Sequence, residues 1–171
     1  KNGKIVPAFY HAKCGGRTLT PKKVWGDFTE GYKSSKCSFC YGHGKKSWSS
    51  KVSKERIISF IKGKKKKNKK IKGVLRLVPN KFEDSKMRYY IGDDLFVIDK
   101  VSLRKAFGRK VFPSHYFWGK VTKKSLSFKG RGRGHGVGMC QLGALHLAQK
   151  GWSYKKILKY YYPNLVIRTI Y

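Results

Sequence analysis

The stretch Phe128–Ala144, which reads FKGRGRGHGVGMCQLGA, carries more structural and functional information than any other part of this chain. Glycine occupies every second position from 130 to 138, on both sides of a single histidine, His135. Alternating glycines leave one face of an extended segment without side chains, so that another group can approach the backbone closely. Residues 141–149 then have the apolar spacing of a helix, which Gly151 would end. We therefore expect a glycine-rich loop that leads into a helix near the C-terminus.

Two well-known glycine-rich motifs do not fit this loop. A phosphate-binding loop ends in Gly-Lys-Ser/Thr, and that ending is missing here. A dinucleotide-binding turn, G-x-G-x-x-G, would need a third glycine after Gly132 and Gly134, where the chain has Val137. The spacing leaves two alternatives open: a turn in which His135 is packed for structural reasons, or a loop whose free backbone N–H groups and histidine contact a ligand.

The remaining patterns predict an α+β domain, β-rich and mixed or antiparallel, with a few short helices. The apolar spacing and the caps, Ser53 and Gly108 among them, predict helices at 53–62, 101–107, 141–149 and 153–161. Alternating or β-branched runs predict strands at 4–10, 71–78, 86–91, 95–98, 115–128 and 165–171. Residues 21–50 and the basic run 63–70 have the composition of loops. We find no internal repeat or domain boundary, so we expect residues 1–171 to form one domain.

The chain is strongly basic, with a net charge of +33 from 41 Lys and Arg residues against 8 Asp and Glu residues. A hydrophobic content of 40% favours a folded domain over a disordered chain. The charge predicts anionic partners, which include the carboxylates of peptidoglycan, other anionic wall polymers, membrane surfaces and nucleic acid. No apolar run approaches the length that is needed to cross a bilayer.

Three cysteines and two histidines have the spacing of metal ligands. Cys37 and Cys40 form a C-x-x-C pair with His43 three residues later, and His11 lies three residues before Cys14. Thiolate and imidazole groups at such spacing suit a tetrahedral zinc ion. We expect a structural zinc ion held by Cys14, Cys37, Cys40 and His43, with His11 as the alternative fourth ligand. A disulfide from Cys14 to Cys37 or Cys40 is the competing interpretation.

The glycine-rich stretch and the residues after it resemble the C-terminal signature of the stage II sporulation protein D (SpoIID/LytB) family. The pattern G-x-G-x-G-H-G-V-G-M-x-Q-x-G-A spans Gly130–Ala144, and A-x-x-G-x-x-Y-x-x-I-L-x-x-Y-Y-P spans Ala148–Pro163. The start of the chain, PAFYHAKCGGRTLTPKKVWG, is similar to the family pattern as well. The family usually has serine at the position of Cys140, which we interpret as a small buried hydrophobic residue.

This resemblance implies a part in cell-wall chemistry in the bacterial envelope (periplasm or cell wall), to which the protein would be exported. Members are similar to peptidoglycan lytic transglycosylases, which cleave the bond between N-acetylmuramic acid and N-acetylglucosamine and leave a 1,6-anhydro end. Their catalytic acid is a Glu in the N-terminal half of the family domain, inside a helix of the E-A-L-K-A-Q-A type, and no such segment occurs here. We therefore expect residues 1–171 to be the C-terminal portion of that domain.

The resemblance also implies which residues contact the substrate. These are Gly15, Gly16, Thr18, His135, Gly136 and Gln141, to which we add Arg131 and Arg133 for their charge; Arg133 departs from the family, which usually has an aromatic residue there. The two arginines on either side of His135 suit an anionic ligand such as the lactyl-peptide group of muramic acid. If a carboxylate of this chain replaces the family Glu, the best candidates are Asp27 and Glu30, which follow the Gly-Gly segment.

Three functions are compatible with the sequence. The first is a portion of a lytic transglycosylase that binds glycan strands. The second is a basic wall-binding module without catalysis, which the missing Glu favours. The third is a nucleic-acid-binding protein, because basic surfaces with interleaved aromatic residues also bind single strands. No recognisable nucleic-acid motif accompanies that composition, so we expect no specific nucleic acid as a partner.

Overall fold

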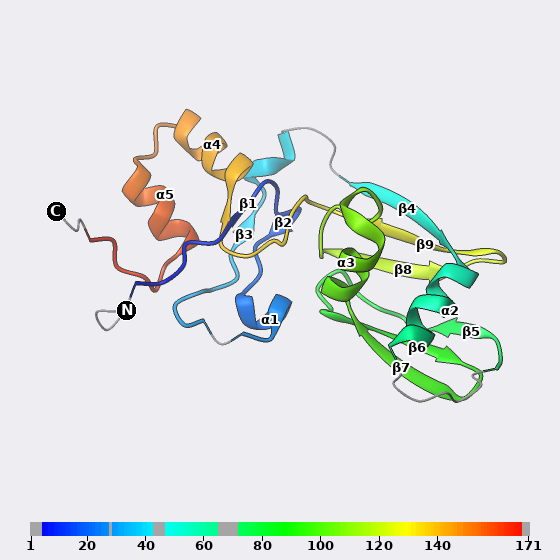
Figure 1. Cartoon of the computed structure of the whole chain (residues 1–171). Helices are drawn as coiled ribbons and strands as arrows, with labels where there is room; N and C mark the ends of the chain where they lie inside the picture. The colour runs from blue at the N-terminus through cyan, green and yellow to red at the C-terminus, as the bar shows by residue number, and fades with distance from the viewer. Residues whose placement is uncertain (1–4, 28, 43–46, 65–71, 169–171) are drawn as a thin grey trace. The chain divides into compact units, whose positions relative to one another are not determined.

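The computed structural model describes residues 5–27, 29–42, 47–64 and 72–168 (Figure 1). It confirms the predicted α+β class, with short helices and several small sheets in which antiparallel pairing predominates. The contacts divide the chain into two compact units. The central unit is Trp48–Gly130, and the terminal unit combines Lys1–Ser47 with Arg131–Tyr171. Residues from both ends of the sequence therefore build one unit.

The central unit consists of two three-stranded antiparallel sheets and two helices. One sheet has the order β4-β9-β8 and the other the order β5-β6-β7. The elements are β4 (Trp48–Ser53), α2 (Lys54–Gly63), β5 (Leu75–Leu77), β6 (Lys86–Ile91), β7 (Asp94–Asp99), α3 (Lys100–Val111), β8 (Phe117–Val121) and β9 (Ser125–Gly130).

Local sequence rules explain most of these elements. The Ser53 side chain accepts a hydrogen bond from the backbone N–H of Arg56, so it caps α2 as predicted. Strands β6 and β7 form the hairpin expected around Gly92. The expected end of α3 at Gly108 is a break with φ of 83°, after which one more helical turn runs to Val111. The first half of the predicted strand region 115–128 is β8, and a turn at Thr122 separates it from β9.

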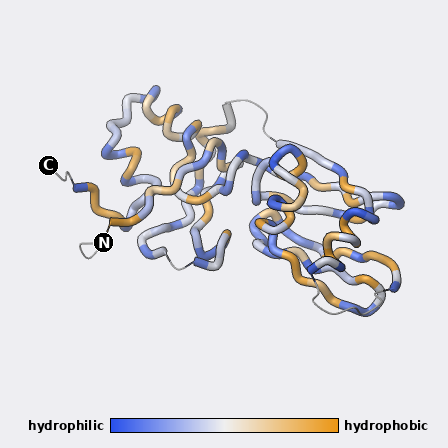
Figure 2. Tube along the Cα trace, in the orientation of Figure 1, coloured by the Kyte–Doolittle hydropathy of each residue, from blue (hydrophilic) through white to orange (hydrophobic). Residues whose placement is uncertain are grey.

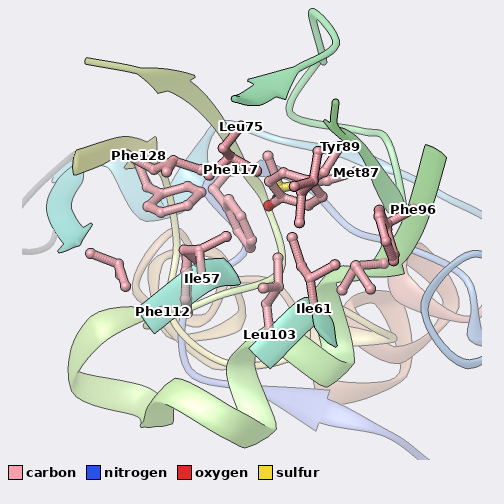
Figure 3. Packing of buried hydrophobic residues seen from close by; sticks show 14 residues of the cluster. Ile57, Ile61, Leu75, Met87, Tyr89, Phe96, Leu103, Phe112, Phe117 and Phe128 are labelled. Carbon is pink, nitrogen blue, oxygen red and sulfur yellow. The ribbon is translucent and has the colours of Figure 1, made fainter. Parts of the chain in front are cut away.

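Hydrophobic side chains from both sheets and both helices of the central unit meet in one core. Figure 3 shows Ile57 and Ile61 of α2 and Leu103 of α3 among the buried side chains of the strands, which include Leu75, Met87, Tyr89, Phe96, Phe117 and Phe128. Hydrophobic and hydrophilic residues are interleaved along the chain (Figure 2), as expected when one face of each strand and helix is buried. Burial of these side chains supplies the main driving force for folding of this unit.

One charged side chain lies inside this unit. Lys100, the first residue of α3, is 1% exposed. Its ammonium group donates hydrogen bonds to the backbone carbonyls of Lys81, Phe82 and Phe117. A buried charge is tolerated only when hydrogen bonds replace the lost water, and here three carbonyl groups do so. Lys100 therefore joins the 81–82 loop to the start of β8.

We predict that Lys100→Met destabilises the chain by about 3 kcal/mol, because buried carbonyl groups lose their donor. The matched control is Lys105→Met, an exposed lysine of the same helix, which should change stability by less than about 0.5 kcal/mol. Urea unfolding followed by circular dichroism measures both values. Equal stability of the two variants would contradict a structural role for the buried ammonium group.

The described part of the terminal unit has very short strands, three α-helices and one 3₁₀ helix. Strand β1 (Tyr10–His11) pairs in parallel with β10 (Met139–Cys140), and β2 (Gly16–Arg17) pairs antiparallel with β3 (Lys36–Cys37). The other elements are α1 (Pro21–Trp25), a 3₁₀ helix, η1 (Phe39–Gly42), α4 (Gln141–Gln149) and α5 (Tyr154–Tyr161). The predicted glycine-rich loop does lead into a helix, and α4 has the predicted bounds 141–149.

Several predictions at the ends of the chain were wrong. The strand expected at 4–10 is reduced to β1, and residues 5–9 are not strand. Residues 165–168 are not strand either, and Val166 and Ile167 are exposed; apolar alternation alone does not make a strand without a neighbouring one. The presumed loop 21–50 contains α1, β3, η1 and part of β4. Most of the basic run 63–70 lies outside the described residues.

Candidate functional site

The glycine-rich loop packs against another part of the same chain. A Cβ atom on Gly132 would lie 2.5 Å from the carbonyl oxygen of Lys13, and one on Gly138 would lie 1.9 Å from that of Phe9. Both glycines have positive φ angles, 78° and 71°. Hydrogen bonds join the two segments, including Lys13 N–H to Arg133 O at 3.0 Å and its reciprocal at 2.7 Å. The group that approaches the glycine face is thus the backbone of residues 9–14.

This pairing and the β2–β3 pair together bring all four cysteines of the chain into one cluster. Cys14 lies between β1 and β2, Cys37 ends β3, Cys40 lies in η1, and Cys140 joins β10 to α4. Their sulfur atoms all lie within 4.8 Å of one another, and the Sγ atoms of Cys14 and Cys40 are 3.5 Å apart. All four side chains are buried and unbridged. The Cys14, Cys37 and Cys40 group predicted from spacing is therefore formed.

The fourth member, Cys140, was missed by sequence analysis. It is buried, as predicted, but it does not stand apart, because the parallel pairing of His11 with Cys140 places its sulfur in the cluster. The even number of cysteines was the signal that could have pointed to it. His43, the predicted fourth ligand, lies outside the described residues.

Polar hydrogens surround the cluster. Backbone N–H groups of Gly16 and Gly143 point to the sulfurs of Cys14 and Cys140, each at 3.4 Å. The second contact caps α4, so the Cys140 sulfur lies at the positive end of that helix. The buried Tyr161 hydroxyl lies 3.2 Å from the Cys37 sulfur. Such donors stabilise thiolates, which are the form of cysteine that binds metals.

The four sulfurs also act on one another's ionisation. The Cys14 thiol lowers the pKa of both Cys37 and Cys40 below the usual value for a thiol by hydrogen bonding to their sulfurs. The pKa of Cys14 is itself raised, first by its hydrogen bond with Cys140 and then by those with the other two sulfurs. The cluster therefore shares protons among buried sulfurs, and a divalent cation could take the place of those protons.

The donor set fits a zinc ion in number, chemistry and spacing. Zinc–sulfur bonds of about 2.3 Å in a tetrahedron put the sulfurs about 3.8 Å apart, and the observed separations bracket that value. A disulfide would join only two sulfurs at about 2.05 Å. The convergence of four sulfurs, with donors already around them, suits a metal better than one disulfide. A site with four protein ligands is closed, and closed zinc sites are structural.

His11, the alternative ligand, lies beside the cluster. Its ring is 3% exposed, its Nδ1 is 3.0 Å from the Val137 carbonyl oxygen, and its Nε2 has no hydrogen-bond partner. Since a carbonyl only accepts, Nδ1 carries the proton and Nε2 is left with a lone pair. The ring is near enough to the Cys140 thiol to influence its ionisation. The residues whose ligand atoms converge are the four cysteines without His11, so the alternative ligand predicted from the sequence lies beside the metal-binding group and is not part of it.

A second group of rings surrounds His135. The ring centroid of His135 lies 5.2 Å from that of Trp25 and 5.7 Å from that of His11, and Phe9 contacts both His135 and Trp25. Nδ1 of His135 accepts the Val137 N–H at 3.1 Å, so the neutral ring carries its proton on Nε2. Trp25 is 39% exposed. The loop thus places an imidazole N–H beside a partly exposed indole.

The other residues implied by the resemblance lie in two kinds of surroundings. Gly15 and Gly136 are buried against Arg131 and Leu19, and the buried Thr18 is hydrogen bonded to the backbone of Ser35. Gly16 pairs with Cys37 in the β2–β3 ladder. The exposed residues of the set are Arg131, Arg133 and Gln141. The described contacts of the buried residues are structural, and a substrate contact remains a prediction for every residue of the set.

The two candidate carboxylates lie beyond α1. Asp27 is exposed and accepts a hydrogen bond from the Thr29 hydroxyl at 3.0 Å. Glu30 is exposed as well. A general acid for glycoside cleavage usually lies in a hydrophobic pocket, whereas both of these carboxylates are exposed. Their part in catalysis remains a prediction.

Comparisons with known proteins give two partial relatives. No family model matches the chain. A stretch of 67 residues, 39% of the chain, is 42% identical to the amidase enhancer of Bacillus subtilis (strain 168). An alignment of 169 residues, 96% of the chain, shows 27% identity to an uncharacterized protein of Brachyspira hyodysenteriae (strain ATCC 49526 / WA1). The chain spans only 10% and 44% of the lengths of these relatives. Within the part that the structure describes, we find no helix long and apolar enough to cross a bilayer.

We predict that Gly138→Ala destabilises the terminal unit by about 3 kcal/mol or more, because the new methyl group would collide with the Phe9 carbonyl. Gly151→Ala is the matched control, since Gly151 has a similar φ of 77° but nothing within 4 Å of its Cβ position. It should lose only the cost of the left-handed backbone, about 1 kcal/mol. Denaturant unfolding monitored by tryptophan fluorescence separates the two, and equal losses would contradict the close approach.

Proposed function

We propose that this chain is a portion of a cell-wall protein of the SpoIID/LytB family and that its terminal unit binds the glycan strands of peptidoglycan. The observation that carries the proposal is the partial similarity to a protein named amidase enhancer, together with the family motifs at both ends of the chain. The geometry supports it because those two motifs pair with each other through β1 and β10. The protein is exported and acts in the bacterial envelope.

The surface at His135 has the chemistry that a glycan strand requires. The partly exposed indole of Trp25 offers an apolar face to a pyranose ring. The Nε2–H of His135 can donate to a sugar oxygen, because its Nδ1 is already engaged by Val137. The exposed guanidinium groups of Arg131 and Arg133 suit the lactyl and peptide carboxylates of muramic acid.

A lytic transglycosylase reaction is the chemistry we propose for the whole protein. A carboxylic acid protonates the glycosidic oxygen, so that the bond from C1 of muramic acid to that oxygen breaks and N-acetylglucosamine leaves with a free hydroxyl. The C6 hydroxyl of muramic acid bonds to C1 and gives its proton to the carboxylate, so that a 1,6-anhydro ring forms, no water is consumed and the acid is regenerated. This chain contributes substrate binding and orientation. Because the family Glu has no counterpart in residues 1–171, we assign the acid to another part of the protein, with Asp27 and Glu30 as the alternatives inside the chain.

We further propose that Cys14, Cys37, Cys40 and Cys140 hold a structural zinc ion. The ion would tie together the Cys14 turn, strand β3, η1 and the start of α4. Its effect on glycan binding would be indirect: it fixes the 9–14 segment and the glycine-rich loop that present Trp25 and His135. The closed four-sulfur set leaves no ligand position for substrate.

The zinc proposal predicts one zinc ion per purified chain, measured by elemental analysis. Cys140→Ser should lose the ion and the folded state together, because metal binding and folding are coupled in such sites. Ser38→Ala is the matched control, an exposed residue between two of the ligands, and it should retain both. A zinc-free, folded chain whose mass shows a disulfide would contradict the proposal.

Glycan binding predicts that purified peptidoglycan sacculi pellet the chain, and that Trp25→Ala and His135→Ala each weaken this binding about tenfold. Tyr154→Ala is the control, because Tyr154 is an aromatic residue of α5 that is 65% exposed. The pelleting assay is done at a salt concentration high enough to screen non-specific attraction by the net charge of +33. Equal pelleting of all variants would show that the His135 surface is not the binding site.

Mass spectrometry of the digested sacculi separates catalysis from binding. Pelleting without 1,6-anhydro ends is the expected result for the chain alone, and it agrees with a binding portion or with a non-catalytic wall-binding module. Release of anhydro ends would place the acid within residues 1–171, and Asp27→Asn and Glu30→Gln would then identify it. If the chain bound nucleic acid but not sacculi at the same salt concentration, the result would favour the third candidate function, nucleic-acid binding.

A further inference from the structure

The β5-β6-β7 sheet of the central unit has one buried face and one face open to solvent. Met87, Tyr89 and Ile91 of β6 and Phe96 and Ile98 of β7 point into the core. Because side chains alternate along a strand, the residues between them point outward. The outward residues of the three strands are Arg76 of β5, Lys86, Arg88 and Tyr90 of β6, and Leu95, Val97 and Asp99 of β7.

This outer face is unusually apolar for solvent-exposed residues. Leu95 is 47% exposed and Val97 is 48% exposed, and Val74, just before β5, is 71% exposed. They are the three exposed large hydrophobic residues of the central unit's described part. The register places Arg76, Tyr90 and Leu95 in one row across the sheet, and Arg88 beside Val97 in the next. Leu95 and Val97, two residues apart on β7, are therefore neighbours on this face, with Tyr90 beside Leu95.

Cations are set among these apolar side chains. The guanidinium of Arg76 lies over the Tyr90 ring, 5.4 Å from its centroid, and Arg88 and Lys86 are exposed along β6. Two acidic groups accompany them: Asp93 lies in the β6–β7 turn, 3.9 Å from Arg76, and Asp99 lies opposite Lys86 at the end of β7, where its carboxylate caps α3. The face thus combines aliphatic side chains with an excess of positive charge.

We propose that the outer face of the β5-β6-β7 sheet is a docking surface for an anionic lipid bilayer. Three outward rows on a small sheet lie near one plane, so their side chains can reach a flat surface together. Cations attract anionic headgroups, and aliphatic side chains gain by entering the interface, which is the combination that peripheral membrane binding needs. A polyanion without apolar parts would leave Leu95 and Val97 unexplained. This inference is independent of glycan binding by the terminal unit.

The test is co-sedimentation of the full chain with vesicles of phosphatidylcholine alone and of phosphatidylcholine mixed with phosphatidylglycerol. Binding to the mixed vesicles only is the expected result. Arg76→Gln with Arg88→Gln should weaken it about 25-fold, since each cation near the surface contributes about fivefold. Leu95→Ser with Val97→Ser should weaken it about tenfold by removing aliphatic surface from the interface.

Matched controls separate this face from the general positive charge of the chain. Lys105→Gln with Arg109→Gln removes two exposed cations of α3, and Leu145→Ser removes an aliphatic residue of α4 that is 47% exposed. Each should change binding by less than about threefold, because charge at a distance is screened. Circular dichroism confirms that every variant is folded.

Two results would overturn the proposal. If the α3 variant lost as much binding as the β-sheet variant, net charge rather than this face would be responsible. The second result has two parts: the wild type and the Leu95→Ser/Val97→Ser variant would bind soluble polyphosphate equally well, and they would also bind vesicles equally well. The face would then be a polyanion site and not a membrane-docking surface. Failure of sacculus binding, by contrast, would bear only on the proposed function of the terminal unit.

Discussion

The close approach of two backbones, residues 9–14 and the glycine-rich loop, is the contact on which the terminal unit depends. The parallel pair β1–β10 has only two residues in each strand, so few hydrogen bonds hold it. Glycine at 132, 134 and 138 lets the segments approach to a distance that any side chain would prevent. That approach aligns His11 with Cys140 and places His135 against Trp25. This packing constraint therefore places Cys140 near Cys14 and forms the ring cluster, while the β2–β3 pairing adds Cys37 and Cys40 to the cysteine cluster.

The two units have cores of different composition. The central unit has a conventional core of aromatic and aliphatic side chains from two sheets and two helices. In the terminal unit the four cysteines lie at the centre of the buried cluster, next to Leu147, Ile157, Tyr161 and Tyr162. Two-residue strands and short helices bury little apolar surface, and small folds of that kind commonly depend on disulfides or metals. The buried sulfurs are therefore understandable as a cross-link, and they need no role in catalysis.

The basic residues have different neighbouring side chains in the two units. Charge alone attracts any polyanion and is screened by salt, so it does not identify a ligand. At the His135 loop, exposed arginines accompany an indole and an imidazole, which are groups that contact a sugar. On the β5-β6-β7 sheet, cations accompany Leu95 and Val97, which are groups that enter a lipid interface. The neighbours of the charges, rather than their number, distinguish the two proposed ligands.

The sequence by itself determined the features that follow local rules. These include α2 with its Ser53 cap, α4 with its bounds, the β6–β7 hairpin, and the grouping of Cys14 with the Cys37–Cys40 pair. Spacing within a short segment sets the helices, the hairpin and the Cys37–Cys40 pair, whereas Cys14 was grouped with that pair by its residue type and is brought to it by the β2–β3 pairing. Only the tertiary structure placed Cys140 in the cluster, shortened the predicted first strand to Tyr10–His11 and turned the glycine face toward residues 9–14. Those features depend on contacts between the two ends of the chain, and a two-residue strand has no periodicity that would reveal its partner.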